Sequence, residues 1–479
     1  MPLILGTNSI KDTGDDVANS LRFNDGSSDH LTRTPASAGN RKTFTFSAWC
    51  KFSNTSTSLT LFHAEIWSTT PWGLIQRQSD NTIRVRFYDG TNDYGIITNR
   101  LFRDVSAWYH IVVAVDTTQG TASNRIKLYV NGVQETSFST ENYPSQNYDT
   151  AFNQSSVEHQ IGEEAGLGRY FDGYMAETVL IDGSQLDATS FGEFDSDSPT
   201  IWKPIDVSGL TFGTNGFYLD FENSGSLGAD VSGNGNNFTV NNLTSIDQST
   251  DTCTNNFATG NPLIKNKTYN DGSLAEGNTY FAPNGRAITC STIGVTQGKW
   301  YAEFKAQDAG ALSIGVGDLQ LGIQANGQTN PIYYDNNPSY AIGYYNSNGN
   351  IQYNTASTSY GNSYADNDII GVALDMDNYA LYFSKNGVFQ NSGDPTSGSS
   401  KTGDATSTAS YNPLNSGEPM FFFVEDFSAA GVGECFLNFG NPAFTISSGN
   451  SDANGYGNFE YSVPSGYYAL NTKNLSEFG

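Results

Sequence analysis

Residues 108–115 read Trp-Tyr-His-Ile-Val-Val-Ala-Val, a run that is apolar on both of its alternating faces. Its length and β-branched content predict a central strand that is covered on both sides. Around it the pattern changes to alternation: residues 44, 46, 48, 50 and 52 are apolar between mostly polar positions, and in residues 83–87 arginines alternate with apolar side chains. Asn131-Gly132 closes another alternating run with a hairpin signal. These short runs predict antiparallel sheets.

A second series of strand signals begins near residue 263, with apolar or alternating runs at 299–304, 312–316, 340–345, 369–374 and 379–383. Residues 201–262 differ, because they are rich in Asn and Gly and hold one basic residue, Lys203. We therefore expect an all-β chain of two antiparallel β-sandwich, jelly-roll-like domains. The expected divisions are a docking segment at 1–19, a domain at 20–200, a connector at 201–262 and a domain with a C-terminal tail at 263–479.

The net charge and the distribution of apolar residues argue against several classes of function. The 479 residues contain 23 Lys and Arg against 49 Asp and Glu, a net charge of −26. Such a chain repels phosphate backbones, so we expect no nucleic-acid partner. No apolar run reaches 18 residues, which argues against insertion into a membrane. The first residues lack a basic region and a long apolar run, so we expect no signal peptide. The four widely spaced cysteines predict reduced, mostly buried thiols.

Four segments of the first half occur in a characteristic order: Ser20-Leu21-Arg22-Phe23-Asn24-Asp25-Gly26, residues 108–113, Leu128-Tyr129-Val130-Asn131-Gly132, and Phe171-Asp172-Gly173-Tyr174-Met175-Ala176-Glu177. Together they resemble the strands of the concanavalin A-like, laminin-G/pentraxin-type lectin sandwich over residues 17–200. The resemblance implies a binding domain.

The second half carries a different ordered set: Gly298-Lys299-Trp300-Tyr301-Ala302-Glu303-Phe304, Ser313-Ile314-Gly315-Val316-Gly317, Ala341-Ile342-Gly343-Tyr344, residues 368–375, residues 381–387 and Leu437-Asn438-Phe439-Gly440. This set resembles the SPRY domain over about residues 263–470.

Phrases outside the two domains resemble linkers of bacteriophage virion proteins: Phe191-Gly192-Glu193-Phe194, Ile201-Trp202-Lys203-Pro204, residues 254–259 and residues 463–470. The combination is similar to tail-fibre or head-fibre proteins. It implies a virion surface protein that is made in the host cytoplasm, contacts other virion proteins in the capsid or tail, forms a homo-oligomer (a trimer is usual among phage fibres) and binds a host surface glycan or protein.

Signs of catalysis are scarce. The histidines are His30, His63, His110 and His159, so a His-dependent triad in the second half is excluded. His110 lies mid-strand, which favours a core role. The carboxylate pairs Asp366/Asp368 and Asp375/Asp377 share strand faces but flank a strand, where turn carboxylates are expected. We expect no enzymatic activity. The alternatives are a capsid decoration protein with a mainly structural role and a polysaccharide depolymerase.

Two further expectations concern ligands. The lectin resemblance implies that Ca²⁺ could bind loop oxygens, for which the candidates are Asp25, Asp29 and Asp230, with solvated turns as the alternative. Loops rich in Tyr, Asn and Trp have the composition of binding surfaces. Their candidate contacts to a sugar are Trp67, Trp72, Tyr333, Tyr334, Asn336, Asn337, Tyr340, Tyr360 and Tyr364. The alternative for these aromatic residues is packing in the core or against a neighbouring subunit.

Overall fold

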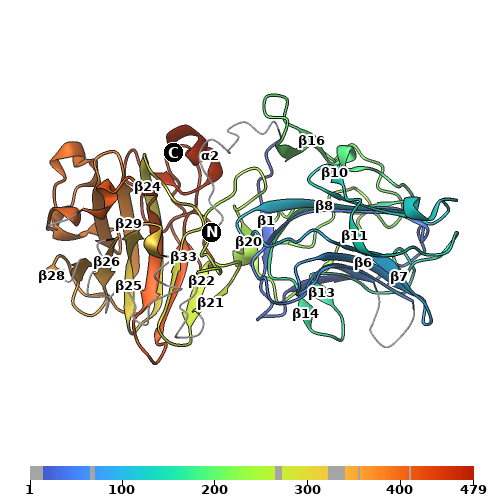
Figure 1. Cartoon of the computed structure of the whole chain (residues 1–479), viewed down its shortest axis with the longest axis horizontal. Helices are drawn as coiled ribbons and strands as arrows, with labels where there is room; N and C mark the ends of the chain where they lie inside the picture. Colours follow the sequence, from blue (N-terminus) through green and yellow to red (C-terminus); the bar gives the residue numbers. More distant parts are fainter. Residues whose placement is uncertain (1–14, 65–70, 265–271, 322–339, 354–355, 409–411) are drawn as a thin grey trace. The chain divides into compact units, whose positions relative to one another are not determined.

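The computed structural model describes residues 15–64, 71–264, 272–321, 340–353, 356–408 and 412–479. Two compact units divide the chain, an N-terminal unit at residues 12–254 and a C-terminal unit that contains residues 255–479. Each unit is built from two antiparallel sheets that pack face to face, as Figure 1 shows. The expected all-β fold class, with two β-sandwich domains, is confirmed.

Sheet A of the N-terminal unit contains the strand predicted from residues 108–115. Its order is β10 (Val133–Gln134), β9 (Ile126–Val130), β8 (Trp108–Asp116), β3 (Thr43–Phe52), β15 (Gly173–Asp182), β1 (Ser20–Phe23) and β20 (Gln248–Ser249), and β18 (Phe217–Leu219) also pairs with β15. Because β8 lies between β3 and β9 and is covered on both faces, its apolar character on both sides is explained.

Sheet B lies below sheet A in Figure 1. Its order is β11 (Phe138–Asn142), β7 (Asp93–Thr98), β6 (Ile83–Tyr88), β5 (Trp72–Arg77), β4 (Leu59–Ala64), β12 (His159–Ile161), β2 (His30–Arg33) and β19 (Thr239–Asn241). Two short hairpins stand outside the sheets: β13 (Glu163–Glu164) with β14 (Arg169–Tyr170), and β16 (Gly192–Phe194) with β17 (Trp202–Pro204).

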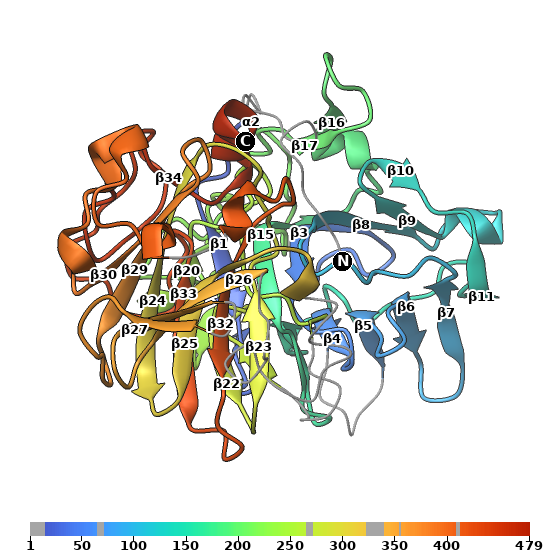
Figure 2. The same cartoon turned by 60° about the vertical axis from the view of Figure 1, so that its left-hand side comes forward.

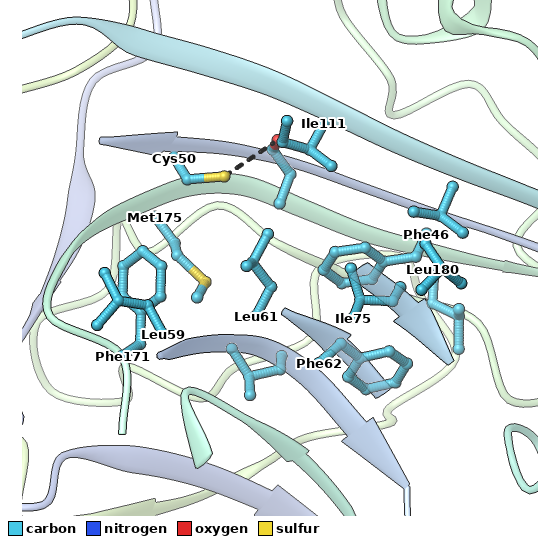
Figure 3. Close-up of a cluster of buried hydrophobic side chains, with 14 of the residues drawn as sticks. Phe46, Cys50, Leu59, Leu61, Phe62, Ile75, Ile111, Phe171, Met175 and Leu180 are labelled. Atoms are coloured by element: carbon cyan, nitrogen blue, oxygen red, sulfur yellow. Dashed lines mark hydrogen bonds between the residues drawn. The ribbon is translucent and has the colours of Figure 1, made fainter. Parts of the chain in front are cut away.

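The core of the N-terminal unit lies between the two sheets. Figure 3 shows part of it, where side chains of both sheets meet: Phe46, Cys50, Leu59, Leu61, Phe62, Ile75, Ile111, Phe171, Met175 and Leu180. A second cluster covers the outer face of sheet A, where Trp49, Val112 and Val179 pack against Phe191 and Trp202. The side chains that β3 directs inward and those that it directs outward are therefore both buried.

Residues 201–254, expected to be part of a connector, belong to the N-terminal unit. They supply β17, β18, β19 and β20, which pair with other strands of this unit. Lys51 of β3 and Asp251 form a fully buried ion pair at 2.7 Å, and Trp108 donates to the same carboxylate. At the other end, Val17, expected in the docking segment, is buried and its N–H donates to Thr254.

The C-terminal unit repeats the two-sheet plan (Figure 2). Sheet C contains β21 (Gly272–Ala275), β22 (Tyr280–Pro283), β33 (Gly433–Asn438), β24 (Lys299–Ala309), β29 (Ile369–Asp375), β30 (Ala380–Lys385) and β31 (Val388–Phe389), with β34 (Tyr468–Ala469) added parallel to β24. Sheet D contains β23 (Ala287–Cys290), β32 (Phe421–Asp426), β25 (Leu312–Gly317), β26 (Ala341–Tyr345), β27 (Asn350–Tyr353) and β28 (Ala356–Ser359).

Helical structure is short throughout the described residues. The helix α2 (Thr472–Phe478) begins at the cap Asn471, whose side chain accepts from the Asn474 N–H. Short 3-10 segments occur at Ala122–Asn124, Ala188–Ser190, Ser245–Asp247, Gln390–Ser392, Pro395–Ser400, Thr406–Thr408 and Pro413–Asn415. None of the helices in the described ranges has the length and hydropathy needed to cross a membrane. The four cysteines are free thiols, and Cys50, Cys290 and Cys435 are buried.

Candidate functional site

The outer face of sheet B carries a concentration of polar side chains. Along β6, Ile83, Val85 and Phe87 enter the core, so Arg84 and Arg86 point to the opposite face. In the register of β5 with β6, Gln76 lies opposite Arg84 and Leu74 lies opposite Arg86. The alternation visible in the sequence therefore places two arginines on one outer face.

Arg86 is held in place by two neighbours. Its guanidinium carbon lies 4.6 Å from the centroid of the Trp72 ring. Its Nε donates to Asp93 Oδ1 at 2.5 Å, and its Nη2 donates to the second oxygen of the same carboxylate. On β7 the residue paired with Arg86 is Gly95, where a Cβ would come within 2.1 Å of the Val85 carbonyl oxygen. Only glycine fits there, so no side chain stands beside Arg86 on that strand.

The β13–β14 hairpin adds a carboxylate and a third arginine to this face. Glu164 is 2% exposed, and its Oε2 accepts from Gln76 Nε2 at 2.8 Å and from Arg169 at 3.0 Å. The same hairpin is attached to β2 by a contact between His30 Nε2 and Glu163 Oε2 at 3.1 Å. Figure 1 shows β13 and β14 on the side of sheet B that faces away from β8. The hairpin therefore extends the outer face of sheet B.

Arg84 differs from its two neighbours. Its Nε is buried and has no hydrogen-bond partner, and among the described residues the side chain forms no ion pair. Burial lowers the pKa of Arg84. The nearby Arg86 and Arg169 lower this pKa further, whereas Glu164 and Asp93 raise it. We call Arg84, Arg86 and Arg169, with the carboxylates of Asp93 and Glu164, the arginine face. In a chain with a net charge of −26, this is a local gathering of positive charge.

A buried histidine lies further along the same side of sheet B. His63 is 2% exposed, and its Nδ1 lies 2.7 Å from Gln160 Oε1. Because an amide oxygen only accepts, Nδ1 is the donor. Burial lowers the pKa of His63. The neutral imidazole therefore fixes Gln160, whose amide donates to Glu158 at 2.8 Å, without adding charge.

The residues that the sequence predicts as sugar contacts, where the structure describes them, are buried. Trp72 lies on the outer face of sheet B but is 6% exposed beneath Arg86, so it supports the guanidinium and is not a stacking platform itself. Trp67, Tyr333, Tyr334, Asn336 and Asn337 lie outside the described residues.

Tyr340, Tyr360 and Tyr364, also expected to contact a sugar, are core residues of the C-terminal unit and are at most 5% exposed. The Tyr364 hydroxyl donates to the carbonyls of Leu312 and Tyr344, and the Tyr360 hydroxyl accepts from the Phe383 N–H. Backbone groups therefore satisfy these hydroxyls inside the core. The structure places these three residues in the core and not on a binding surface.

The candidate calcium ligands act within turns. Asp29 accepts from the Asn24 N–H and from Ser27 Oγ, and Asp230 accepts from the N–H groups of Tyr218, Ser232 and Asn236. Burial raises the pKa of Asp25. Within the described ranges, no three His, Cys, Asp or Glu side chains gather closely enough to hold a metal ion. The structure therefore does not bring Asp25, Asp29 and Asp230 together into one cluster.

His110 is bonded in the opposite sense from a catalytic histidine. Its Nδ1 lies 2.9 Å from Trp202 Nε1, which can only donate, so Nδ1 is an acceptor. The proton of the neutral ring is then on Nε2, which lies 2.8 Å from Ser47 Oγ and donates to it. A Ser–His pair that acts as a base needs its Nδ1–H directed at a carboxylate. Burial lowers the pKa of His110 to about 3, as expected of a core histidine.

The two sequence-predicted carboxylate pairs also have structural partners. Asp366 accepts from the Ala309 N–H and Asp368 binds Lys385. Asp375 is fully buried and binds Lys299 at 2.9 Å, and Asp377 accepts from the Gly298 N–H. These contacts close turns around β29.

Two other buried carboxyl groups were not anticipated. Burial raises the pKa of Glu177 to about 7 and that of Glu303 to about 7. Glu177 accepts from the Tyr218 hydroxyl at 2.6 Å and lines an internal space too narrow for water. Glu303 accepts from the N–H groups of Glu460 and Tyr461, each at 2.8 Å. No sequence pattern marks either residue, because both settings are created by segments distant in the chain.

Comparison with known families matches one segment in each half of the chain. Residues 25–187 match Laminin_G_3, the concanavalin A-like lectin/glucanases superfamily, and residues 299–405 match the SPRY domain. The chain carries a concanavalin A-like lectin domain and a SPRY domain. The arginine face belongs to the lectin domain, because β5, β6, β7 and the β13–β14 hairpin lie inside residues 25–187. Among curated proteins, none matches this sequence.

Solved structures match single domains at low identity. The SPRY domain of human HERC1 is 17% identical with a TM-score of 0.25, and the match covers 33% of this chain and 87% of that one. A heptameric SAP-like pentraxin from Limulus polyphemus is 15% identical with a TM-score of 0.27, over 36% and 79%. Domain 4 of the arabinanase AbnA from Geobacillus stearothermophilus, in complex with arabinotriose, is 19% identical with a TM-score of 0.25, over 32% and 67%. The domain assignment rests on the two family matches.

Proposed function

We propose that this chain is a non-enzymatic protein that binds a glycan through the arginine face of its lectin domain. The observation that carries the proposal is Arg86, which is stacked on Trp72 and lies beside the unpartnered Arg84 on the outer face of a lectin-type sheet. Guanidinium groups donate to sugar hydroxyls and carbonyls in fixed directions. Because Trp72 and Asp93 hold Arg86 in one place, little side-chain freedom is lost on binding.

The carboxylates of the arginine face support binding and not hydrolysis. A glycosidase needs a carboxylic acid that can protonate the leaving group and a second carboxylate at a defined separation. Here Asp93 is bound by Arg86 and Glu164 by Arg169, so each carboxylate fixes an arginine. The buried Glu177 and Glu303 are enclosed by protein groups. We therefore propose recognition without covalent chemistry.

The place of action that we propose is the virion surface. The support is the pairing of lectin and SPRY domains with linker phrases similar to those of phage fibre proteins. In this proposal the chain forms a homotrimer, contacts other virion proteins and attaches to a host surface glycan. Several copies on one particle would convert weak single-site sugar contacts into strong attachment, because the second contact becomes intramolecular.

Glycan binding is tested by screening the full-length protein against an array of bacterial surface glycans. The test variant is Arg86→Ala. Arg100→Ala is a matched control, because Arg100 also pairs with a carboxylate, that of Glu135, and lies over an aromatic ring, that of Phe102. We expect Arg86→Ala to weaken binding about tenfold or more and Arg100→Ala to leave it unchanged. Equal binding by all three proteins, or release of reducing ends from a bound glycan, would contradict the proposal.

The virion assignment needs its own experiment. Purified phage particles from the source of this sequence would be labelled with an antibody against the chain and imaged. Regularly placed label on the particles is the expected result, and its position on head or tail separates a fibre from a capsid decoration protein. Label on host components alone would contradict the virion assignment and leave glycan binding to be decided by the array.

A further inference from the structure

We propose that Arg84 binds an anionic group of the saccharide, a carboxylate or a sulfate ester, so that the preferred ligand of the arginine face is an acidic glycan. This inference rests on the proposed glycan binding and adds the chemical class of the ligand. It concerns one side chain, Arg84, whose surroundings differ from those of the other two arginines.

The charges of the arginine face leave one positive charge unmatched. Three guanidinium groups stand against two carboxylates, so the sum is +3 − 2 = +1. Arg86 binds Asp93 through two hydrogen bonds, and Arg169 binds Glu164 at 3.0 Å. Both carboxylates are therefore engaged by other arginines. The excess charge is localised on Arg84.

The residues that pair with Arg84 on the two adjacent strands offer it no anion. On one side, Gln76 directs its amide N–H groups to Thr60 Oγ1 at 3.0 Å and to Glu164 at 2.8 Å. On the other side, the residue paired with Arg84 on β7 is the apolar Ile97. The Arg84 Nε is buried without a hydrogen-bond partner, while the residue as a whole remains partly exposed. The guanidinium is thus desolvated on its inner side and reachable from its outer side.

A planar anion fits this setting better than a neutral hydroxyl. Carboxylate and sulfate groups present two oxygens that match two parallel N–H donors of a guanidinium, and such charge-assisted bonds are the strong ones. An anion would also offset the repulsion from Arg86 and Arg169 that lowers the Arg84 pKa. The net charge of −26 disfavours unspecific adsorption of acidic polymers, so binding of an acidic glycan requires a dedicated site.

The experiment compares ligands that differ only in charge. Isothermal titration of the full-length protein would use two pairs, trigalacturonic acid with its methyl ester, and a sulfated galactan oligosaccharide with its desulfated form, all at one ionic strength. The variants are Arg84→Met, which removes the charge, and Arg84→Lys, which keeps the charge but loses the planar fork. Arg103→Met is the control, because it removes an exposed arginine of the same unit.

We expect the natural protein to bind the charged member of at least one pair about 10- to 100-fold more tightly than its uncharged member. Arg84→Met should abolish this preference, Arg84→Lys should retain part of it, and Arg103→Met should keep it whole. Preference within the galacturonate pair identifies a carboxylate, and preference within the galactan pair identifies a sulfate. A circular dichroism spectrum of each variant would show whether it is folded, so that a lost charge preference is not mistaken for misfolding.

Two results would overturn the inference. The first is equal binding of charged and uncharged members, and the second is a charge preference that survives Arg84→Met. If a sugar still binds in either case and binding depends on Arg86, the proposed glycan function stands while the acidic preference fails. If no glycan of the array or of these pairs binds the natural protein, both proposals fail together.

Discussion

The guanidinium of Arg86 lies over the ring of Trp72, a diagonal neighbour on the adjacent strand of sheet B. The tryptophan is buried and fixes the direction of Arg86, so in the proposed recognition it would contribute only indirectly. A residue type often expected to stack on sugars here acts as a support for a charged donor. This relationship leads to the first prediction.

Trp72→Phe should weaken glycan binding about two- to fivefold, because a smaller ring gives a weaker cation–π interaction and holds Arg86 less firmly. Calorimetric titration with the best ligand from the array measures the change. Trp49→Phe is the control, since Trp49 lies in the cluster on the outer face of sheet A. Unchanged affinity in Trp72→Phe would show that Arg86 does not depend on its aromatic support.

The buried pair Lys51–Asp251 predicts that the lectin-domain unit needs residues beyond 200. Asp251→Ala should lower the free energy of unfolding of this unit by about 3–5 kcal/mol, because it leaves the Lys51 ammonium buried without its carboxylate. Chemical denaturation followed by tryptophan fluorescence measures the loss. A combined Lys51→Met and Asp251→Leu variant should recover most of the stability, since the buried ammonium and its carboxylate are then removed together.

The same contacts predict the behaviour of fragments. Residues 12–254 should fold as a cooperative unit, whereas residues 12–200 should not, because they lack β18, β19 and β20, which pair with β15, β2 and β1. Thermal unfolding followed by circular dichroism compares the two fragments. A cooperative transition at the same temperature in both would mean that residues 201–254 contribute nothing to the fold.

Glu303 predicts an unusual pH dependence of stability. Its folded pKa is about 7 against an ordinary value of 4.5, so between these values the folded unit binds the extra proton. Its contribution to stability is therefore fully present below about pH 4.5 and is lost as the pH rises through 7. The full effect is on the order of 3 kcal/mol. Glu303→Gln should flatten this part of the pH profile of the unfolding free energy, and the exposed control Glu418→Gln should not. An unchanged profile in Glu303→Gln would contradict the assignment.

The hydrogen bond from Trp202 to His110 predicts a coupling between the two residues. Trp202→Phe should destabilise the unit by about 2–4 kcal/mol, because it leaves a buried acceptor without a donor and creates a small cavity. In a double-mutant cycle with His110→Leu, the interaction energy should be about 1 kcal/mol or more. Strict additivity of the two substitutions would show that the bond adds no stability.

The fold was predictable from the sequence, whereas the boundary of the N-terminal unit was not. Residues 43–52 and 108–115 carry strong patterns because both strands are central in sheet A. The strands in residues 201–254 are two or three residues long, and β20 pairs with β1, more than 220 residues earlier. A strand that short leaves no periodic signal, and its Asn- and Gly-rich surroundings resemble a linker.

The candidate site shows the same limit at the level of side chains. Tyrosines suit both a binding loop and a core, and only the structure shows that the hydroxyls of Tyr360 and Tyr364 meet backbone groups. The alternation that exposes Arg84 and Arg86 was visible in the sequence. Its meaning was not, because Glu164 arrives from a hairpin 80 residues away and leaves Arg84 as the arginine without a partner.

The most direct test of the account is a crystal structure of the full-length protein with the acidic oligosaccharide that binds most tightly in the titrations. The account predicts the ligand on the outer face of sheet B, with an anionic oxygen within hydrogen-bond distance of the Arg84 guanidinium and Arg86 in contact with the same sugar. A ligand bound on another face, with Arg84 untouched, would contradict it.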